Sequence, residues 1–533
     1  MDPRLSAAIT ESHLPTPRNI PEDFLLGAAA AAYQIEGAAN EDGRGPSIWD
    51  KFSRVDGAVV NGETGDVACD HYHLYREDVA MMRDLGLDAY RFSVSWARVC
   101  PDGKTLNPKG LDFYKRLVDE LQGAGILPWL TLYHWDLPLA LEEKGGWPAR
   151  DTAEYFRDYA MLVHEGLGDR VGVWTTLNEP WCASFLSYTG GEHAPGHHSL
   201  AEGMLASHHL LLGHGLAIQE LRSANPDLNL GLTLNFTVAQ PLDPSSPEDQ
   251  RAARLVDGQF NRWFLDPIFK GSYPRDIVDE FTDVDPEAGA AFASAVKPGD
   301  LEIIGAPINT LGINYYQSDL LSASATPPLE ITERLGIAEL APAPSGGAPT
   351  TRQNTNPMPA SRGFVGPDSL LPRTFQNWDI DPLMFKDLLL RLDRDYTRQA
   401  GVKMYVTENG AAYDDRVEQT ENGPVVHDPD RTAYIKLHLA AVLDAKDEGA
   451  DVGGYLYWSL MDNYEWAWGY NRRFGIVYVD YQTQERIIKD SGKAYSQIIS
   501  ERTIDVGPDA GLLVRRGSLV EGRTESLWNG VTD

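Results

Sequence analysis

Cysteine is scarce in this sequence: the chain of 533 residues contains only three cysteines, Cys69, Cys100 and Cys182. They are far apart, odd in number and form no CxxC pair, so we expect neither a disulfide framework nor a structural zinc site. No stretch approaches the roughly 20 apolar residues that a membrane-spanning helix needs. The first 20 residues contain acids and prolines in place of an apolar signal core. These features predict a cytoplasmic protein without a membrane segment.

Basic residues are also few, since 46 lysines and arginines face 78 aspartates and glutamates, which gives a formal net charge of −32. Such a field repels nucleic acid, anionic membrane surfaces and phosphorylated substrates. A neutral small molecule is little affected by it. We therefore expect a small neutral substrate, with no nucleic-acid and no membrane partner, and we attribute the acidity to solubility.

Sequence signatures of nucleotide and metal sites are missing as well. No GxGxxG or GK[ST] pattern follows an early strand-like run, and no HExxH is present. The histidines at positions 71 and 73, and those between 193 and 214, do not have the spacing of a closed metal site with carboxylate or thiolate support. We interpret them as structural or surface residues and predict neither a metal nor a cofactor.

What the sequence does contain is a regular alternation of short apolar runs and longer stretches with helical periodicity, such as 75–86, 113–125 and 432–450. This alternation favours an α/β protein in which a parallel sheet closes into a single (β/α)8 barrel with extended βα loops. We place the barrel at residues 21–503, with an N-terminal extension at 1–20 and a C-terminal tail at 504–533. The eight runs are 24–30, 89–96, 127–133, 171–177, 228–236, 310–315, 403–407 and 454–460.

Polar or aromatic residues lie at or just beyond the ends of most of these runs, where barrels of this type carry their sites. Two of them, Glu179 and Glu408, are glutamates that end apolar runs, and a lone carboxylate there is costly to bury. Two carboxyl groups facing one barrel mouth suit the acid and nucleophile roles of glycosidic bond cleavage. Tryptophans at the same ends can pack against the C–H faces of a sugar. The strand-end residues are Gln34, Arg91, His134, Trp135, Asn178, Glu179, Asn314, Tyr316, Glu408, Asn409, Trp458, Glu465 and Trp466.

Several long motifs resemble those of glycoside hydrolase family 1, the β-glucosidase family. TLNEP around Glu179 and VTENG around Glu408 are similar to its two catalytic signatures. The similarity follows family order from about residue 21 to residue 503. The other motifs are AAYQIEGA (31–38), YRFSVSWARV (90–99), TLYHWDLPLALEEKGGW (131–147), LGINYY (311–316), GYLYWSLMDNYEWAWGY (454–470) and RRFGIVYVD (472–480).

The resemblance implies a retaining mechanism, with Glu179 as the acid/base and Glu408 as the nucleophile. It implies that Arg91 and Tyr316 hold Glu408 in place and ionised. A retaining enzyme should separate its two carboxyl groups by about 5–5.5 Å. The residues that would bind the sugar are Gln34, His134, Trp135, Asn178, Asn314, Tyr316, Trp458, Glu465, Trp466 and Phe474.

The expected substrates are terminal non-reducing β-D-glucosyl residues of cellobiose, short cello-oligosaccharides and aryl β-glucosides. A β-galactosidase or β-fucosidase of broad specificity, a transglycosylase and an inactive sugar-binding protein are the alternatives. Glu465 would repel a phosphorylated sugar. Alanines in AAAAAYQIEGA (28–38), Cys100 and Glu192 depart from the usual family pattern and leave the aglycone preference open. Residues 322–362, rich in proline, alanine, serine and threonine, are predicted to form an insertion that shapes the aglycone site or a subunit contact.

Overall fold

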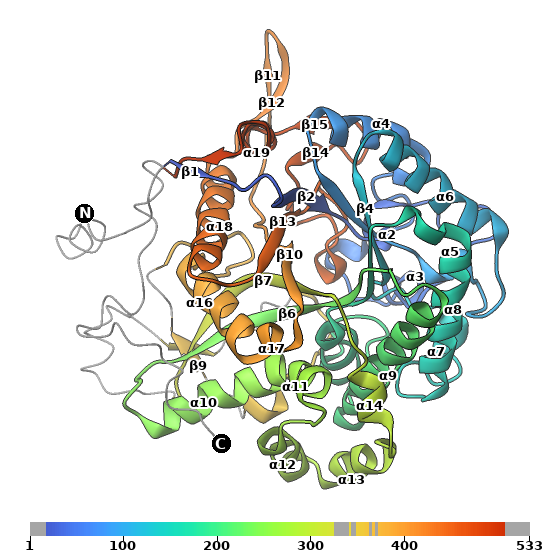
Figure 1. Cartoon of the computed structure of the whole chain (residues 1–533), viewed down its shortest axis with the longest axis vertical. Helices are drawn as coiled ribbons and strands as arrows, with labels where there is room; N and C mark the ends of the chain where they lie inside the picture. Colours follow the sequence, from blue (N-terminus) through green and yellow to red (C-terminus); the bar gives the residue numbers. More distant parts are fainter. Residues whose placement is uncertain (1–16, 325–339, 343–347, 362–364, 368–370, 507–533) are drawn as a thin grey trace.

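Eight parallel strands close into a barrel at the centre of the molecule (Figure 1). The computed structural model describes residues 17–324, 340–342, 348–361, 365–367 and 371–506. Around the barrel the strand order is β10-β13-β2-β3-β4-β5-β6-β7, so the first and last barrel strands are neighbours. Each of the eight predicted runs overlaps one of these strands, and the barrel prediction is confirmed. The strands are β2 (Leu25–Ala29), β3 (Ala89–Ser93), β4 (Leu127–Tyr133), β5 (Val173–Asn178), β6 (Leu230–Pro241), β7 (Thr310–Leu321), β10 (Lys403–Glu408) and β13 (Val452–Trp458).

Helices surround the barrel and cover the outward faces of its strands (Figure 1). The predicted helical stretches 75–86, 113–125 and 432–450 correspond to α4, α6 and α18, which begin earlier in the sequence than the periodicity indicated. The longer helices are α4 (His71–Asp84), α6 (Pro108–Gly123), α8 (Asp151–Leu167), α9 (Leu200–Ala224), α10 (Pro247–Asp257), α11 (Trp263–Lys270), α12 (Arg275–Val284), α13 (Pro286–Ala295), α16 (Pro382–Leu392), α18 (Pro429–Asp447) and α19 (Asp490–Glu501). The shorter ones are α2 (Ala32–Ile35), α3 (Ile48–Phe52), α5 (Trp96–Val99), α7 (Leu139–Glu142), α14 (Asp300–Ile304) and α17 (Arg398–Ala400).

Local sequence signals explain where several of these helices begin. Proline occupies the first turn of α6, α10, α13, α16 and α18, where its fixed φ suits the helix and its missing N–H costs nothing. Ser47 and Asp50 form a reciprocal capping box at the start of α3. At α9, the Ser199 side chain accepts a hydrogen bond from the Glu202 amide.

Large side chains fill the barrel interior. The rings of Trp129 on β4 and Tyr405 on β10 lie 5.1 Å apart, although these strands are not neighbours in the barrel order. Ala89, Val173 and Leu456 from three further strands join the same buried cluster. The barrel is therefore packed with side chains, as is usual for this architecture.

The two ends of the described chain meet beside the barrel. The short strand β1 (Arg18–Asn19) pairs antiparallel with β16 (Thr503–Ile504). Arg502 strengthens this junction, because its guanidinium donates hydrogen bonds of 2.6 Å to the carbonyl groups of Pro21 and Phe24. Part of the predicted N-terminal extension and of the predicted C-terminal tail, at residues 17–20 and 504–506, thus joins the folded body.

Smaller elements extend the loops. Three two-stranded antiparallel sheets pair β8 (Leu340–Pro342) with β9 (Val365–Pro367), β11 (Val417–Thr420) with β12 (Gly423–Val426), and β14 (Val477–Val479) with β15 (Arg486–Ile488). Short 3-10 or π-helical turns occupy Val60–Gly62, Gly168–Arg170, Cys182–Gly190, Gly258–Arg262, Pro359–Ser361, Asp393–Thr397 and Trp466–Trp468. In the described part of the chain, no helix has both the length and the apolar character that crossing a membrane requires.

Candidate active site

Glu179 lies directly after β5, at the point where the chain turns from a strand into a helix. Its backbone adopts a left-handed conformation with φ 46°, which is unusual for a residue with a side chain. Pro180 then starts a helical turn that leads into the π-helix Cys182–Gly190. Trp135 and Trp466 also have positive φ values, of 77° and 49°. Strained backbone of this kind concentrates at functional sites, where the surrounding structure holds it in place.

Glu408 is the last residue of β10 and is 3% exposed. Arg91 on β3 donates a hydrogen bond of 2.6 Å to its Oε1 atom, and the Tyr316 hydroxyl on β7 donates one of 2.8 Å to Oε2. Arg91 is itself buried, with 1% exposure, so the ion pair is shielded from water. Both predicted supporting residues therefore contact Glu408 directly, one on each carboxylate oxygen.

Two asparagines connect the two glutamates. Asn314, which pairs with Glu408 in the register of β7 and β10, donates a hydrogen bond of 2.6 Å to Glu179 Oε1. Its own carbonyl oxygen accepts from the Thr407 hydroxyl at 2.8 Å, which fixes the orientation of the amide. Asn178 Oδ1 accepts from Arg91 at 2.6 Å and from Asn314 at 3.1 Å. The hydrogen-bond network thus runs from Glu179 through Asn314 and Asn178 to the Arg91–Glu408 ion pair.

The two carboxyl groups have different proton affinities. Burial, together with the negative charge of Glu408, raises the pKa of Glu179 to about 8, against 4.5 for an ordinary glutamate. Burial also raises the pKa of Glu408, but Arg91 and Tyr316 oppose this at hydrogen-bond distance. Glu408 therefore ionises at a lower pH than Glu179. An ionised carboxylate beside a protonated one is the combination that a nucleophile and a general acid require.

Cys182, for which the sequence predicted no role at the site, contacts Glu179 through its side chain. The thiol Sγ lies 3.2 Å from Glu179 Oε2, and burial and the Glu179 charge keep the pKa of the thiol well above its ordinary value. The protonated thiol therefore donates to the Glu179 carboxyl group. The contact arises because the turn after Glu179 is helical, which brings residues three apart together. That spacing in NEPWC was the one sequence signal for it.

The predicted sugar-binding residues surround this pair. Trp135 Nε1 donates to the Asn178 carbonyl at 3.0 Å, and the His134 ring stacks between Trp458 and Trp466 at centroid distances of 5.9 and 6.0 Å. Phe474 packs with Trp458 in a small buried cluster. Burial, followed by the negative charges of Glu408 and Glu179, raises the pKa of Glu465 to about 8.

Gln34 and His134 carry buried polar atoms that lack hydrogen-bond partners in the described part of the chain. Gln34 Nε2 donates to Asn463 Oδ1 and to the Tyr464 carbonyl, at 3.0 and 2.8 Å. Gln34 Oε1 and His134 Nδ1 have no hydrogen-bond partner within the described ranges. Burial, followed by the Arg91 charge, lowers the pKa of His134 well below its ordinary value, so its ring is neutral. Buried polar atoms without partners are expensive, and a hydroxylated ligand would satisfy them.

The histidines that could suggest a metal site are partly buried structural residues and partly surface residues, such as His73, whose side chain is 47% exposed. Over the described residues, no three histidine, cysteine, aspartate or glutamate side chains form a group that could hold a metal ion. His71 contacts Asp78 at 2.8 Å, and His208 contacts Asp300 at 3.0 Å. His193 is enclosed by the rings of Trp49, Trp135 and Trp466.

Comparison with known proteins agrees with this geometry. The sequence model described as Glycosyl hydrolase family 1 matches residues 16–504. The chain belongs to this family. Family members with similar sequences include the thermostable beta-glucosidase B of Thermobispora bispora, 46% identical over 486 residues that make up 90% of each chain. A bifunctional beta-D-glucosidase/beta-D-fucosidase of Bifidobacterium breve is 44% identical over 91% of this chain and 98% of its own.

A solved family 1 structure extends the comparison to three dimensions. The psychrophilic beta-glucosidase of Micrococcus antarcticus is 50% identical, covers 91% of this chain and 98% of its own, and superimposes with a TM-score of 0.83. The resemblance inferred from the motifs is thus confirmed over nearly the whole chain. In this family 1 enzyme the predicted site residues lie on the barrel strands or in the segments that follow them, and the contacts described above link most of them.

Proposed function

We propose that the protein is a retaining, exo-acting β-glucosidase that removes terminal non-reducing β-D-glucosyl residues by double displacement. The observation that carries this proposal is the asymmetry of the two carboxyl groups: Arg91 and Tyr316 donate to Glu408 and favour its ionised form, whereas burial and the Glu408 charge favour the protonated form of Glu179. The names of the family members described above agree with it. The expected substrates are cellobiose, short cello-oligosaccharides and aryl β-glucosides.

In this mechanism Glu408 attacks the anomeric carbon while Glu179 protonates the departing glycosidic oxygen. Once Glu408 is esterified, its negative charge is lost, and the pKa of Glu179 falls because one of the causes that raised it is gone. Glu179 can then act as a base that takes a proton from the attacking water. Two carboxyl groups and water complete the cycle, so the proposed reaction calls for no cofactor. The carboxyl separation of about 5–5.5 Å that retention requires stays a prediction.

The remaining site residues bind the sugar in this proposal. Gln34, His134 and Glu465 would hydrogen-bond its hydroxyl groups, since Gln34 and His134 each present a buried atom without a partner. Asn178 would hold the 2-hydroxyl, and its position is fixed by Arg91 and Asn314. Trp135, Asn314, Tyr316, Trp458, Trp466 and Phe474 complete the proposed pocket around these groups.

The proposal is tested by the stereochemistry of the product and by removal of the nucleophile. Proton NMR of early hydrolysis of a 4-nitrophenyl β-D-glucoside should show β-glucose before mutarotation. Glu408→Ala should lose turnover, and added azide should restore formation of a product of inverted configuration. An α-glucose first product, or full activity in Glu408→Ala, would contradict the assignment.

A β-galactosidase or β-fucosidase of broad specificity is the second candidate, because one close relative is named for both glucosidase and fucosidase activity. Comparing kcat/KM on nitrophenyl glucoside, galactoside and fucoside decides between them. Product analysis at high sugar concentration measures any transglycosylation.

We also propose that the described part of the insertion, 348–361, shapes the aglycone site. It contacts the loop after the π-helix that follows Glu179, because the Ala348 amide donates to Glu192 Oε1 at 3.0 Å and the Thr355 amide donates to the Gly190 carbonyl at 2.9 Å. Residues 325–339, 343–347 and 362 of the predicted insertion, and most of the two terminal segments, lie outside the described residues.

We further propose that 21–503 forms one catalytic domain in the cytoplasm. The closed barrel supports a single domain, and the three cysteines, all buried free thiols, suit a reducing compartment. Limited proteolysis, which should leave one resistant core, tests the domain limits, and cell fractionation tests the location.

A further inference from the structure

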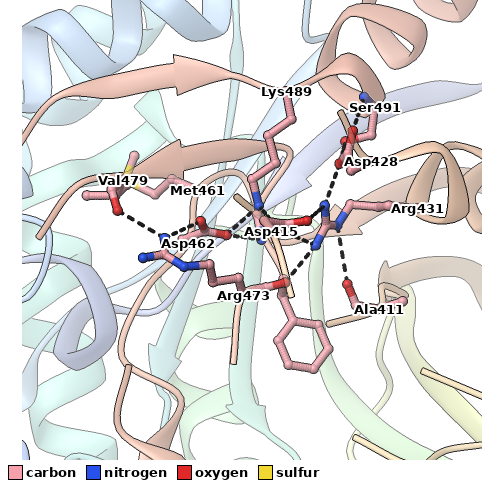
Figure 2. Close-up of polar contacts among 12 residues, drawn as sticks. Ala411, Asp415, Asp428, Arg431, Met461, Asp462, Arg473, Val479, Lys489 and Ser491 are labelled. Atoms are coloured by element: carbon pink, nitrogen blue, oxygen red, sulfur yellow. Dashed lines mark hydrogen bonds and ion pairs between the residues drawn. The ribbon is translucent and has the colours of Figure 1, made fainter. Parts of the chain in front are cut away.

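Figure 2 shows a buried network of charged side chains, two of which, Asp462 and Arg473, flank Glu465 and Trp466 in the sequence. It contains three carboxylates and three cationic groups, so their formal charges balance. The members come from the loops after β10 and β13 and from α18 and the start of α19. They are Asp415, Asp428, Arg431, Asp462, Arg473 and Lys489.

Lys489 is the centre of this network. Its ammonium group is 0% exposed and contacts both Asp415 Oδ2 and Asp462 Oδ1, the second at 2.7 Å. Burial raises the pKa of Asp415, but Lys489 and Arg431 outweigh that effect and hold the pKa below its ordinary value. The contact between Lys489 and Asp415 is therefore an ion pair away from water.

Asp462 connects Lys489 to the loop beyond β13. Its Oδ2 atom accepts from Arg473 at 2.7 Å, and its Oδ1 atom accepts from the Gly475 amide at 3.0 Å. Asp462 and Gly475 stand at the two ends of a segment that carries Glu465, Trp466 and Phe474. One carboxylate thus ties both ends of that segment together.

Arg431 anchors the other side of the network. Its guanidinium donates to both oxygens of Asp415, at 3.0 and 2.7 Å, and to the Arg473 carbonyl at 2.7 Å. It also contacts Asp428, whose carboxylate accepts from the Ser491 amide at 2.8 Å. Asp415 follows β10, the strand that ends at Glu408, so the network connects the loop beyond the nucleophile with the segment 462–475 (Figure 2).

Stabilisation of the fold does not by itself explain such a network. Removing ions from water costs several kcal/mol each, and well-packed apolar residues often stabilise a protein at least as much as a buried ion pair does. Fixed ion pairs can instead hold two loops in a defined position relative to each other, because every carboxylate oxygen described above accepts a hydrogen bond from a donor. Figure 2 shows these contacts as a chain that runs from Asp462 through Lys489 and Asp415 to Arg431.

We propose that Lys489 and Asp462 are positioning residues for the sugar pocket, holding segment 462–475 against the loop beyond Glu408. The proposal rests on the proposed function, because it takes Glu465 in this segment to bind the sugar. Neither residue touches the substrate. Without Lys489 the segment loses its direct link through Asp462 to Asp415, although Arg431 still joins Asp415 to the Arg473 carbonyl, so Glu465 is held less firmly in the pocket.

Lys489→Met keeps the length of the side chain and removes its charge. We expect KM for 4-nitrophenyl β-D-glucoside to rise about tenfold, with a smaller change in kcat, since an interaction made in both the ground state and the transition state is weakened. Asp415→Asn, which is nearly isosteric, removes the same ion pair from the other side. Asp415→Asn should also raise KM, and it tests the proposal if Lys489→Met does not fold.

A matched control is the buried ion pair between Arg391 and Asp257, which has comparable burial and links α10 to α16. Arg391→Met should lower the melting temperature by a similar amount and leave KM unchanged. A double-mutant cycle with Glu465→Gln then separates positioning from general damage. If Lys489 acts through Glu465, Lys489→Met should raise KM much less in the Glu465→Gln background than in the wild type.

The outcomes separate this inference from the proposed function. A wild-type protein that does not hydrolyse the glucoside with retention overturns the proposed function itself. If the wild type is active, three results would overturn the inference alone. The folded variants could keep the wild-type KM, or Lys489→Met could have the same effect on KM in both backgrounds. Arg391→Met could also raise KM as much as Lys489→Met does. Raised KM in Lys489→Met or Asp415→Asn, non-additivity with Glu465→Gln and an unchanged KM in the control support it.

Discussion

Tyr316→Phe removes one hydroxyl group from the site and leaves its ring. In the structure that hydroxyl donates to Glu408 Oε2 at 2.8 Å. A hydrogen bond to a charged group is worth about 1.5–3 kcal/mol. If the contact is fully needed in the transition state, kcat/KM for an aryl β-glucoside should fall by about 13- to 160-fold.

The same substitution should change the pH dependence. Loss of the Tyr316 donor destabilises the carboxylate form of Glu408 and raises its pKa further. Because the nucleophile must be ionised, the acid limb of the kcat/KM profile should move to higher pH. The measurement is kcat/KM against pH for the wild type and the variant, with the same substrate and ionic strength.

The adjacent residue provides a control. Tyr315 precedes Tyr316 on β7, so its side chain points to the other face of the strand, and its hydroxyl donates to the Asp381 carbonyl at 2.9 Å. Tyr315→Phe should affect stability but leave the acid limb where it is. A Tyr316→Phe variant within about twofold of wild-type kcat/KM, or an acid limb that stays or moves to lower pH, would refute the reasoning about Glu408.

Three further changes test other parts of the site. Cys182→Ala removes a donor from Glu179, so its pKa should rise above about 8 and the alkaline limb of kcat/KM should move to higher pH; Cys182→Ser, which keeps a donor, should restore it. Glu179→Gln should melt at a higher temperature than the wild type at pH 7. Between about pH 4.5 and 8, Glu179 is protonated in the folded wild type but ionised in its unfolded chain, so the wild type loses stability as the pH rises. The difference in melting temperature should therefore grow over that range. Glu192→Ala removes the acceptor of the Ala348 amide, so KM should change more for cellobiose than for an aryl glucoside; equal changes would argue against an aglycone role.

Much of the architecture was predictable because it depends on local patterns. Each apolar run became a barrel strand, and the polar residues at the ends of those runs gathered at one mouth because parallel strands end on the same side. The Arg91–Glu408 ion pair was also expected from the motifs, and it lies where the register of the barrel places it. In these cases, short sequence signals and the symmetry of the barrel determine the position.

Other features of the site could not be predicted from local patterns. The left-handed backbone of Glu179 has no glycine to signal it, and the thiol contact of Cys182 depends on that turn. The ion pairs of Lys489 join residues far apart in the chain, and a lysine near a helix start ordinarily indicates a solvated surface. Such contacts depend on how the loops pack after the barrel has formed, which residue type and spacing do not specify.

The position of β2 next to β13 has a consequence for synthesis of the protein. These two strands form a parallel pair, with Gly454 opposite Leu25, although they lie near opposite ends of the chain. At about 5–20 residues per second, roughly 20 to 90 seconds of translation separate their emergence from the ribosome. For that time the nascent sheet has an open edge, which is where unfinished chains join one another. A cell that makes this enzyme must therefore protect a half-built barrel, and mutations that slow its closure should reduce yield before they reduce the activity of each finished molecule.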